Sequence, residues 1–241
     1  DFLKFLDLTF PTPEQNLACD EALLDLCEEG KTGELLRFWE SEKYFVVLGS
    51  SNKFREEVNV EACELSEIPI LRRHSGGGTV LQGPGCLNFS LILNIDPSSP
   101  TRNITETTRY IMQRHAEVFS NLLGEMVEMK GSSDLTIDGK KFSGNAQRRR
   151  MKALLFHGTF LLDFDLNLIE KYLQSPAKQP DYREQRNHLD FVRNISAGRE
   201  QIKLQLQTVW DATTLFEHLP HGRIKELVNE KYSDKKWIYK N

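Results

Sequence analysis

Three consecutive glycines, Gly76, Gly77 and Gly78, restrict the fold of this chain more than any other stretch. Glycine loses more backbone entropy on folding than any other residue. A run of glycines is therefore expected where the backbone adopts positive φ or lies directly against a ligand. The apolar run 68–71 precedes the glycines, and residues 87–93, apolar at alternate positions, follow them. The glycines are predicted to form a loop between two strands.

Two arginines, Arg72 and Arg73, stand just before the glycines. A guanidinium beside free backbone N–H groups suits the oxygens of a phosphate or a carboxylate, which predicts an anion site. A flexible hairpin with two solvated arginines is the alternative, because glycine-rich loops are common. No helix signal follows the glycines. Their spacing matches neither the dinucleotide-binding Gly-x-Gly-x-x-Gly pattern nor the phosphate-binding loop that ends in Gly-Lys-Ser/Thr, so both nucleotide motifs are excluded.

The length of 241 residues allows one large domain or two small ones, and a single domain over residues 1–241 is the simpler prediction. A content of 39% hydrophobic and 27% charged residues is typical of a soluble globular protein. No stretch approaches the roughly 18 apolar residues of a membrane span, so we expect no membrane partner. The net charge of −4 argues against nucleic acid as a partner, although the basic run 148–150 with Lys152 could bind an acidic partner.

The four cysteines form neither Cys-x-x-Cys pairs nor a disulfide-dense pattern. Cys19 and Cys27 fall in one predicted helix and are interpreted as small buried residues. This usage predicts a reducing compartment and a cytoplasmic location. The sequence begins at Asp1 rather than at methionine, which leaves a trimmed leader open.

Hydrophobic periodicity and turn residues divide the chain into helices and strands. The acidic face of the first predicted helix, which includes Asp20 and Glu21, is expected to be solvated surface. Residues 157–159 are expected to interrupt a strand. The polar segment 176–190 has no clear period and is typical of a functional or mobile surface segment, which leaves open whether it closes over a ligand as a lid. Helices are predicted over 14–30, 58–65, 103–124, 166–173 and 224–232, and strands over 1–10, 35–39, 44–48, 135–137, 140–143 and 154–162, with a two-residue turn at 138–139.

Four polar units are candidates for a site, although each one alone has a structural explanation. Lys141 is typical of a solvated hairpin lysine, because most lysines are exposed. His157 is typical of a core histidine whose ring is hydrogen-bonded. Residues 143–146 are of types that commonly form turns. The four units are residues 72–78, Asn88 with Ser90, residues 134–147, and residues 157–159.

In this order and at these separations, the units resemble the lipoate-protein ligase and octanoyltransferase family, which shares a superfamily with the biotin-protein ligases. The ordered set is more specific than any single member, and it covers roughly residues 5–175. The resemblance implies an α+β catalytic domain like that of class II aminoacyl-tRNA synthetases and biotin-protein ligases, in which helices flank a mainly antiparallel central sheet. The matching residues are 16–18, 20–23, 36–39, 46–49, 72–80, Asn88, 134–135, 139–141, 143–147 and 157–162.

The resemblance also implies a chemistry. In similar ligases, lipoate is activated with ATP to lipoyl-AMP, and the lipoyl group then passes to the ε-amine of a lysine on a lipoyl domain. Lys141 matches the family's lysine, whose ammonium would stabilise charge that develops at the acyl carbonyl and the phosphate during transfer. Asp134 would orient Lys141 or the adenylate. The implied substrate- and adenylate-binding residues are Arg73, Ser75, Gly76, Gly77, Gly78, Asn88, Asp134, Lys141, Ser143, Gly144, Ala146, His157, Gly158 and Thr159.

The implied ligands and partners follow from the same family. ATP with Mg²⁺ and lipoate would be the substrates, and no metal ligands are expected in the protein itself. The acceptors would be lipoyl-domain proteins, namely the E2 subunits of 2-oxoacid dehydrogenases and the H protein of glycine cleavage. The larger bacterial ligases carry an extra C-terminal domain that assists adenylation, whereas about thirty residues follow Asp211 here. We therefore expect a separate accessory polypeptide for the ATP step, or transfer from a preformed donor. Candidates for an apolar tunnel around the lipoyl chain are Val46, Leu48, Val80 and Phe89.

One position departs from the family pattern. Gln82 stands where many ligases carry a histidine four residues after the third glycine, so any contact of that imidazole is changed or lost. A separate alternative is a non-enzymatic module that binds lipoate or lipoyl-adenylate and has lost turnover. The presence of Arg73, Lys141 and His157 argues against this alternative.

The alternative enzyme is an octanoyl- or lipoyl-transferase that works through a cysteine thioester. Such a mechanism needs a thiolate with a lowered pKa near the lysine. Some octanoyltransferases carry this cysteine close to a Phe-His-Gly motif. The corresponding position in this chain is Ala153, Leu154 or Leu155, and no cysteine follows Cys86. Cys86 is interpreted as buried rather than nucleophilic.

Overall fold

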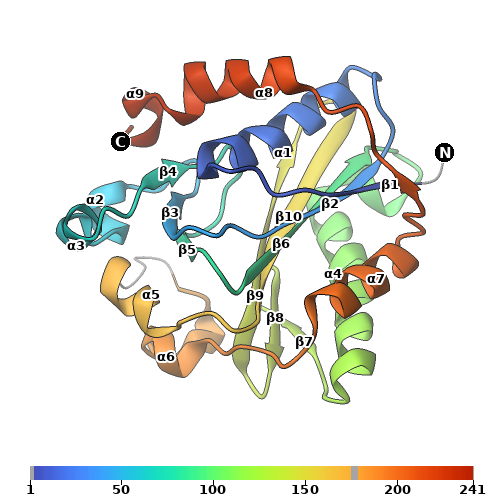
Figure 1. The fold of residues 1–241 in the computed structure, drawn as a ribbon. Coiled ribbons are helices and arrows are strands. Elements are labelled where there is room, and N and C mark those ends of the chain that lie inside the picture. Colours follow the sequence, from blue (N-terminus) through green and yellow to red (C-terminus); the bar gives the residue numbers. More distant parts are fainter. Residues whose placement is uncertain (1–2, 175–178, 241) are drawn as a thin grey trace.

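The computed structural model describes residues 3–174 and 179–240. An eight-stranded sheet crosses the centre of the molecule (Figure 1). From edge to edge the strands are β11 (Thr214–Leu215), β1 (Lys4–Asp7), β2 (Leu35–Trp39), β6 (Cys86–Asn94), β10 (Ala153–Leu161), β9 (Lys140–Arg149), β8 (Asp134–Ile137) and β7 (Glu128–Lys130). Strand β1 pairs in parallel with β11 and with β2, and all other neighbouring strands are antiparallel. The predicted α+β fold with a mainly antiparallel sheet is therefore confirmed.

A smaller sheet of three strands contains β4 (Ile70–Arg72), β3 (Phe45–Leu48) and β5 (Val80–Gln82). The central strand β3 pairs in parallel with β4 and antiparallel with β5. Residues 73–79, the glycine loop, connect β4 to β5, so the prediction of a glycine-containing loop between two strands is confirmed. Because β3 lies between the strands that the loop connects, the loop crosses the carboxyl end of β3.

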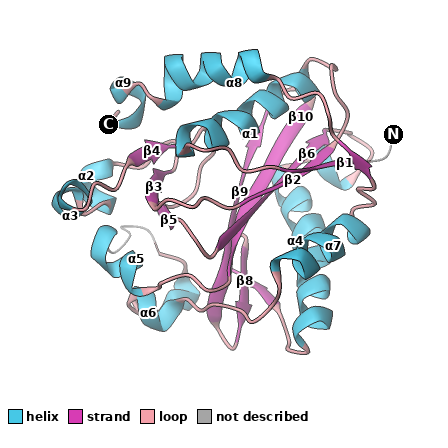
Figure 2. Ribbon diagram, viewed as in Figure 1, coloured by secondary structure: helices cyan, strands magenta, loops and turns pink. Residues whose placement is uncertain are grey.

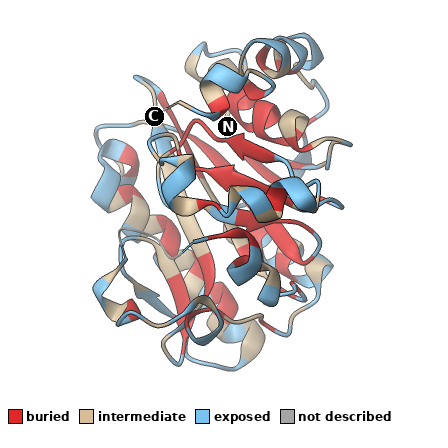
Figure 3. Ribbon diagram, turned by 90° about the vertical axis from the view of Figure 1, so that its left-hand side faces the viewer, coloured by how far each residue is buried: buried red, intermediate tan, exposed pale blue. Residues whose placement is uncertain are grey.

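Helices cover both faces of the large sheet (Figure 2). The helices α1 (Pro13–Glu28) and α8 (His221–Leu227) lie on the same face as the small sheet, whereas α4 (Ile104–Leu123) and α7 (Arg199–Val209) cover the other face. Each face has its own buried cluster, and the central strands β2, β6 and β10 are buried over most of their length (Figure 3). The short helices are α2 (Phe54–Glu57), α3 (Val60–Leu65), α5 (Asn167–Tyr172), α6 (His188–Phe191) and α9 (Lys235–Ile238), with 3₁₀ turns at Pro100–Arg102 and Asp181–Arg183 and a π-helical turn at Val228–Tyr232.

Local sequence signals account for the main boundaries. Helix α1 begins with a capping box, in which Thr12 accepts from the backbone N–H of Gln15 and the Gln15 side chain accepts from the backbone N–H of Thr12. Helix α4 ends at Gly124, whose φ of 66° suits a left-handed C-cap. Asp138 and Gly139 have φ values of 51° and 72°, which form the predicted tight turn between β8 and β9.

Several predicted boundaries were wrong. The strand expected over residues 1–10 is limited to Lys4–Asp7, and residues 1–2 lie outside the described residues. Strand β10 continues through residues 157–159 instead of being interrupted, because it pairs on both sides with β6 and β9. Gly158 is required there, since a Cβ would lie 1.8 Å from the side-chain oxygen of Asn145. Helix α7 was not predicted.

The first part of the acidic face of α1 is not solvated, which corrects a further prediction, whereas Glu29 at its end is exposed as expected. Asp20 and Glu21 are only 3% and 4% exposed. Basic side chains from other elements reach this face, so the carboxylates are buried in pairs rather than surrounded by water. Arg150 illustrates this, because its Nη2 lies 3.0 Å from Asp25 Oδ1. Arg150, one residue of the basic run 148–150, therefore pairs with a carboxylate of this chain rather than with an acidic partner.

The four cysteines are all free and buried, which confirms the interpretation of Cys19 and Cys27. Among residues 3–174 and 179–240, no helix combines the length and the apolarity that a bilayer crossing requires. The same residues contain no group of three or more His, Cys, Asp or Glu side chains placed to hold a metal ion.

Candidate functional site

Four neighbouring strands of the large sheet place the candidate residues in one row across the sheet. The directly paired residues are Asn88 on β6, Thr159 on β10, Gly144 on β9 and Asp134 on β8. Paired residues on adjacent strands point to the same face, so these four positions, the polar row, share one side of the sheet. Two residues further along β10, a second row on the same face consists of Ser90, His157 and Ala146.

A cavity of about 530 Å³ lies over these two rows. Small-molecule sites commonly have volumes of roughly 300–1,000 Å³, so the cavity can enclose a ligand of that class. Ser75 and Gly76 do not line it, although both were predicted to bind the ligand. The predicted residues that do line it are Arg73, Gly77, Gly78, Asn88, Asp134, Lys141, Ser143, Gly144, Ala146, His157, Gly158 and Thr159.

The apolar lining differs in part from the prediction. Val80 lines the cavity as expected. Phe89 borders the cavity, but its side chain is completely buried on the other face of the large sheet, where it stacks on Phe160. On β3 the lining residue is Val47, whereas the predicted Val46 and Leu48 are buried in the core between the sheets. Successive side chains of a strand point to opposite faces, so the prediction was displaced by one residue along β3.

Arg73 holds the glycine loop from inside. Its Nε donates to Ser75 Oγ at 3.1 Å, and its Nη2 donates to the carbonyl oxygens of Gly76 and Gly78 at 2.6 and 2.8 Å. Burial lowers the pKa of Arg73 to about 10, with a smaller opposite effect of Glu57. The guanidinium thus shapes the loop, while the N–H groups of residues 76–78 make no hydrogen bond within the described chain. Of these residues, Gly77 and Gly78 line the cavity, so the loop borders it with unpaired backbone donors.

Two glycines make this loop geometry possible. Gly77 has a φ of 89°, which favours glycine. At Gly49, directly after β3, a Cβ would lie 2.2 Å from the carbonyl oxygen of Gly77. Any side chain at this position would push the glycine loop away from the end of β3.

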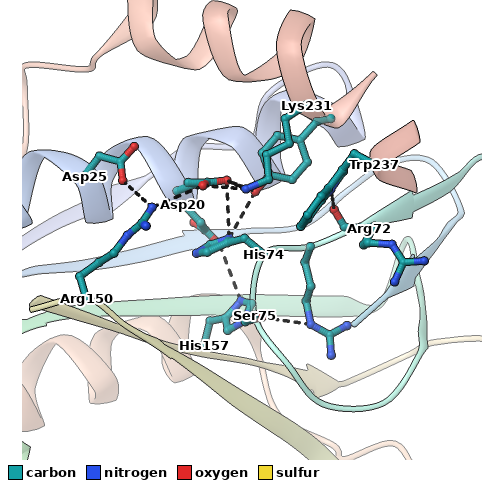
Figure 4. A network of polar contacts seen from close by, with 12 residues as sticks. Asp20, Asp25, Arg72, His74, Ser75, Arg150, His157, Lys231 and Trp237 are labelled. Carbon is teal, nitrogen blue, oxygen red and sulfur yellow. Dashed lines mark hydrogen bonds and ion pairs between the residues drawn. The ribbon is translucent and has the colours of Figure 1, made fainter. Parts of the chain in front are cut away.

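Arg72 is also buried, so the alternative of two solvated arginines is wrong. Its Nη1 donates to the carbonyl oxygen of Asn52 at 2.7 Å, and its Nε to that of Ile238 at 2.9 Å. Trp237 Nε1 donates to the carbonyl oxygen of Arg72 at 2.9 Å. Arg72 therefore connects the base of the glycine loop to helix α9 instead of facing the cavity (Figure 4).

One end of the polar row carries the charged groups. Lys141 Nζ lies 2.9 Å from Asp134 Oδ1, and Tyr182 Oη donates to Asp134 Oδ2 at 2.7 Å. A Cβ at Gly144 would lie 2.7 Å from Lys141 Nζ, so the absence of a side chain leaves the space that the ammonium fills. The expected contact between Asp134 and Lys141 is therefore present, and the ammonium lies above the polar row at Gly144.

The second row connects the sheet to the glycine loop. His157 Nε2 lies 2.6 Å from Ser75 Oγ, and His157 Nδ1 lies 3.9 Å from Asp20 Oδ2. Burial lowers the pKa of His157 to about 4, with Asp20 opposing and Arg73 adding to the shift. His157 is therefore neutral near pH 7 and positions Ser75 through a hydrogen bond, not through charge.

His74 and His115 are buried, and His157 is largely buried beside the cavity. Burial is the largest cause of the lowered pKa in each, to about 3 for His74 and His115 and about 4 for His157. His115 accepts a hydrogen bond from Trp210 Nε1 at 3.0 Å on the far face of the sheet. All three are neutral in the folded protein at neutral pH.

Glu21 connects His74, the residue before Ser75, with Lys231 and Tyr232 near the C-terminus. Lys231 Nζ lies 2.8 Å from Glu21 Oε1, and Tyr232 Oη donates to Glu21 Oε2 at 2.6 Å. His74 Nδ1 lies 3.2 Å from the same Tyr232 oxygen. Although burial opposes it, the nearby His74, Lys231 and Tyr232 keep the pKa of Glu21 below its ordinary value. Figure 4 shows the polar contacts running from the helices at the top to His157 on the sheet.

Gln82, the position that departs from the family pattern, belongs to a closed ring of hydrogen bonds. Its Nε2 donates to Thr159 Oγ1 at 2.8 Å, and its Oε1 accepts from Asn88 Nδ2 at 2.9 Å. Thr159 Oγ1 donates to Asn88 Oδ1, which closes the ring. All three residues line the cavity, so Gln82 retains a place in the site through its amide.

Cys86 is completely buried on β6, as interpreted from the sequence. Its Sγ donates to the carbonyl oxygen of Leu81 at 3.8 Å. Burial raises its pKa far above the ordinary value, only partly offset by a hydrogen bond from Gly83. Burial likewise raises the pKa values of Cys19, Cys27 and Cys63 to about 11.

Sequence reasoning missed the roles of Asp20 and Tyr182, and part of the signal was present. Asp20 lies three residues after Leu17 and four before Leu24, on the buried stripe of α1 rather than on its outer face. Tyr182 falls in the polar segment 176–190, of which residues 176–178 lie outside the described residues. No local pattern connects Tyr182 to Asp134, which is 48 residues away.

A family model, that of the lipoyl protein ligase A/B catalytic domain, matches residues 12–213. A probable lipoate-protein ligase A from Mycoplasma pneumoniae is 35% identical over 209 residues, which are 86% of this chain and 56% of that protein. This chain thus spans little more than half the length of that relative. An octanoyltransferase LipM from Halalkalibacterium halodurans is 24% identical over 272 residues, 98% of each chain.

Solved structures share the fold. A bi-partite lipoate protein ligase from Thermoplasma acidophilum, solved in a study that included its E2 lipoyl domain, superposes with a TM-score of 0.83. Its identity is 23%, over 99% of this chain and 96% of that one. A lipoate-protein ligase A bound with ATP gives a TM-score of 0.81 at 23% identity, over 99% of both chains.

Proposed function

Because the chain belongs to the lipoyl protein ligase A/B catalytic-domain family, we propose that it is a lipoate-protein ligase. In this proposal it activates lipoate with ATP to lipoyl-AMP and transfers the lipoyl group to a lysine of lipoyl-domain proteins. Relatives carry the names of both ligases and octanoyltransferases, so the choice between the two depends on the chemistry of this chain.

The burial of all four cysteines favours the ligase over the thioester-forming transferase. A thioester route needs a thiolate that the acyl donor can reach, at a pKa near or below neutrality. All four thiols are buried, and burial raises the pKa of each. Transfer without a covalent enzyme intermediate, from an adenylate, therefore suits this chain better.

The cavity offers a division of roles for this transfer. Lys141 would stabilise the charge that develops on the acyl carbonyl oxygen and the phosphate, and Asp134 would hold the ammonium in place. The free N–H groups of Gly77 and Gly78, which line the cavity, would bind the phosphate oxygens. Arg73, Ser75 and His157 would maintain the loop that presents those N–H groups. Ser143, Ala146 and Gly158 would complete the wall of the cavity.

ATP, Mg²⁺ and the acceptor are further parts of the proposal. Mg²⁺ would enter with the phosphates of ATP, which commonly supply part of its coordination. The acceptors would be the lipoyl domains of E2 subunits and the glycine cleavage H protein, in the cytoplasm. A separate accessory polypeptide would serve the ATP step, which parallels the bi-partite ligase of Thermoplasma acidophilum.

Intact mass of an acceptor lipoyl domain tests the proposal. Purified protein is incubated with the acceptor and one of three donors: lipoate with ATP and Mg²⁺, synthetic lipoyl-AMP, or octanoyl carrier protein. A lipoyl mass added from lipoyl-AMP by the wild type, and lost in Lys141→Ala, supports ligase chemistry. Addition from lipoyl-AMP but not from ATP indicates that the accessory polypeptide is needed. Addition only from octanoyl carrier protein would overturn the ligase assignment in favour of a transferase.

Cys86→Ala separates the two enzymes independently. The substitution leaves adenylate-dependent transfer unchanged, because Cys86 contacts a backbone carbonyl rather than the ligand region. Complete loss of transfer in a folded Cys86→Ala protein would point to the thioester route. Binding of lipoyl-AMP without any transfer would leave the non-enzymatic module as the remaining assignment.

A further inference from the structure

Glu57, the last residue of α2, lies beside the glycine loop and borders the cavity. Its Oε2 accepts hydrogen bonds from both the hydroxyl and the backbone N–H of Thr79, the residue that ends the loop. Its Oε1 accepts from Asn52 Nδ2 at 2.8 Å. A carboxylate offers about four acceptor positions, and these contacts occupy three of them. Glu57 is therefore placed to hold its neighbours in the chain rather than to bind a ligand.

The unpaired donors of the glycine loop lie between two holding contacts. On one side, Arg73 Nη2 donates to the carbonyl oxygens of the first and third glycines. On the other side, the N–H of Thr79 is donated to Glu57 at 3.3 Å. The N–H groups of Gly77 and Gly78 lie between these contacts. Because a glycine backbone has many accessible conformations, the direction of these N–H groups depends on contacts that fix both ends of the loop.

The backbone around Glu57 also supports a second wall of the cavity. The carbonyl oxygen of Glu57 accepts from the N–H of Gln174 at 3.0 Å. Val58 forms an antiparallel bridge with Leu173, and its carbonyl oxygen accepts from Gln174 Nε2 at 3.1 Å. Leu173 and Gln174 follow α5 and line the cavity. The same short segment thus supports both the glycine loop and the wall beside α5.

We propose that Glu57 is a positioning residue for phosphate binding, whose carboxylate holds Thr79 so that the N–H groups of Gly77 and Gly78 face the phosphate of an acyl-adenylate. The inference rests on the proposed function and adds a residue to which that function gives no role. A loop that is held in advance saves the cost of ordering it when the phosphate binds. The carboxylate is itself an anion beside the proposed phosphate site, so an effect of its charge alone would have the opposite sign.

Steady-state transfer from synthetic lipoyl-AMP to an acceptor lipoyl domain, followed by intact mass, tests this role. In Glu57→Ala the KM for lipoyl-AMP should rise about tenfold while kcat stays close to the wild-type value, because the loop binds the phosphate equally in the ground state and the transition state. The Kd of lipoate, measured by isothermal titration, should also stay close to the wild-type value, because lipoate has no phosphate. A substitution that only damaged the fold would weaken lipoate binding as well.

Two further variants separate the hydrogen bonds from the charge. In Glu57→Gln the side-chain oxygen can still accept from Thr79. Asn52 Oδ1, which is buried without a partner among the described residues, can accept from the new amide after a half-turn of the Asn52 amide. The KM of Glu57→Gln should therefore stay within about threefold of the wild-type value. Thr79→Val removes the hydroxyl and should raise the KM, and adding it to Glu57→Ala should cause no further loss.

Glu56→Ala is the matched control, because this exposed neighbour pairs with Lys53 at the surface and should behave as the wild type. A KM that is unchanged or lower in folded Glu57→Ala would overturn the inference and leave the ligase proposal standing. Equal losses in Glu57→Ala and Glu57→Gln, or additive losses with Thr79→Val, would also overturn it. A wild type that neither binds lipoate nor transfers from lipoyl-AMP would refute the proposed function and the inference together.

Discussion

The buried ion pair between Arg37 and Asp20 should make Asp20→Ala one of the most destabilising single substitutions in the chain. Arg37 Nη1 lies 2.6 Å from Asp20 Oδ1, and both side chains are almost completely buried. The second carboxylate oxygen accepts from Ser90 Oγ at 2.8 Å. Removing one partner of a buried pair leaves an uncompensated charge, which costs about 3–5 kcal/mol. This loss is a large share of the 5–15 kcal/mol that typically separates folded from unfolded states.

Urea unfolding followed by circular dichroism measures the effect. With an m value of about 3 kcal/mol/M, the midpoint should fall by roughly 1–1.7 M. Adding Arg37→Met to Asp20→Ala should recover part of the loss, because the unpaired charge is then removed as well. Glu106→Gln is the control, since the Arg102–Glu106 pair has the same 2.6 Å separation but is exposed, and the midpoint should not change measurably. A loss below about 1 kcal/mol for Asp20→Ala, or a double variant no more stable than the single one, would refute the reasoning.

Three further predictions concern the site and its surroundings. Gly144→Ala should displace the lysine ammonium and reduce transfer at least tenfold with little change in melting temperature, whereas Gly33→Ala, with open space at its Cβ, should leave both unchanged. Because their pKa values are lowered in the folded protein, His74, His115 and His157 bind protons only when the protein unfolds, so the stability that their neutral forms provide is complete above about pH 6.5 and falls as the pH drops toward 4. Each contributes up to about 1.4 kcal/mol per pH unit in this range, and a flat stability between pH 5 and 7 in denaturant titrations would contradict the assignment. The four cysteines should react with a thiol reagent only at the rate of unfolding, and a fast-reacting thiol in the native protein would reopen the thioester route.

The glycine loop and the β8–β9 turn were predictable because their signals are local. Gly77 and the Asp138-Gly139 pair have positive φ values, a backbone conformation that few other residues adopt. The polar row was not predictable from the residues alone. It depends on the register among strands far apart in the sequence, such as the pairing of Asn88 with Thr159, and register is set by the packing of the whole sheet.

The acidic residues of α1 show a second limit of sequence reasoning. A carboxylate is usually solvated, so the outer-face assignment was the expected one for Asp20 and Glu21. Their partners, Arg37 and Lys231, lie 17 and 210 residues away, and burial is favourable only when both partners arrive. The family resemblance included Asp20 and Glu21 in its matching residues but gave no reason for their burial.

The polar row is assembled from four separate strands. Its members Asn88, Thr159, Gly144 and Asp134 come from β6, β10, β9 and β8, and only the pairing of these strands brings them into line. A shift of one strand by a single residue would turn that strand's member of the row to the opposite face of the sheet. The row therefore exists only in the fully registered sheet, so a partly folded chain that still has its secondary structure would lack this wall of the cavity.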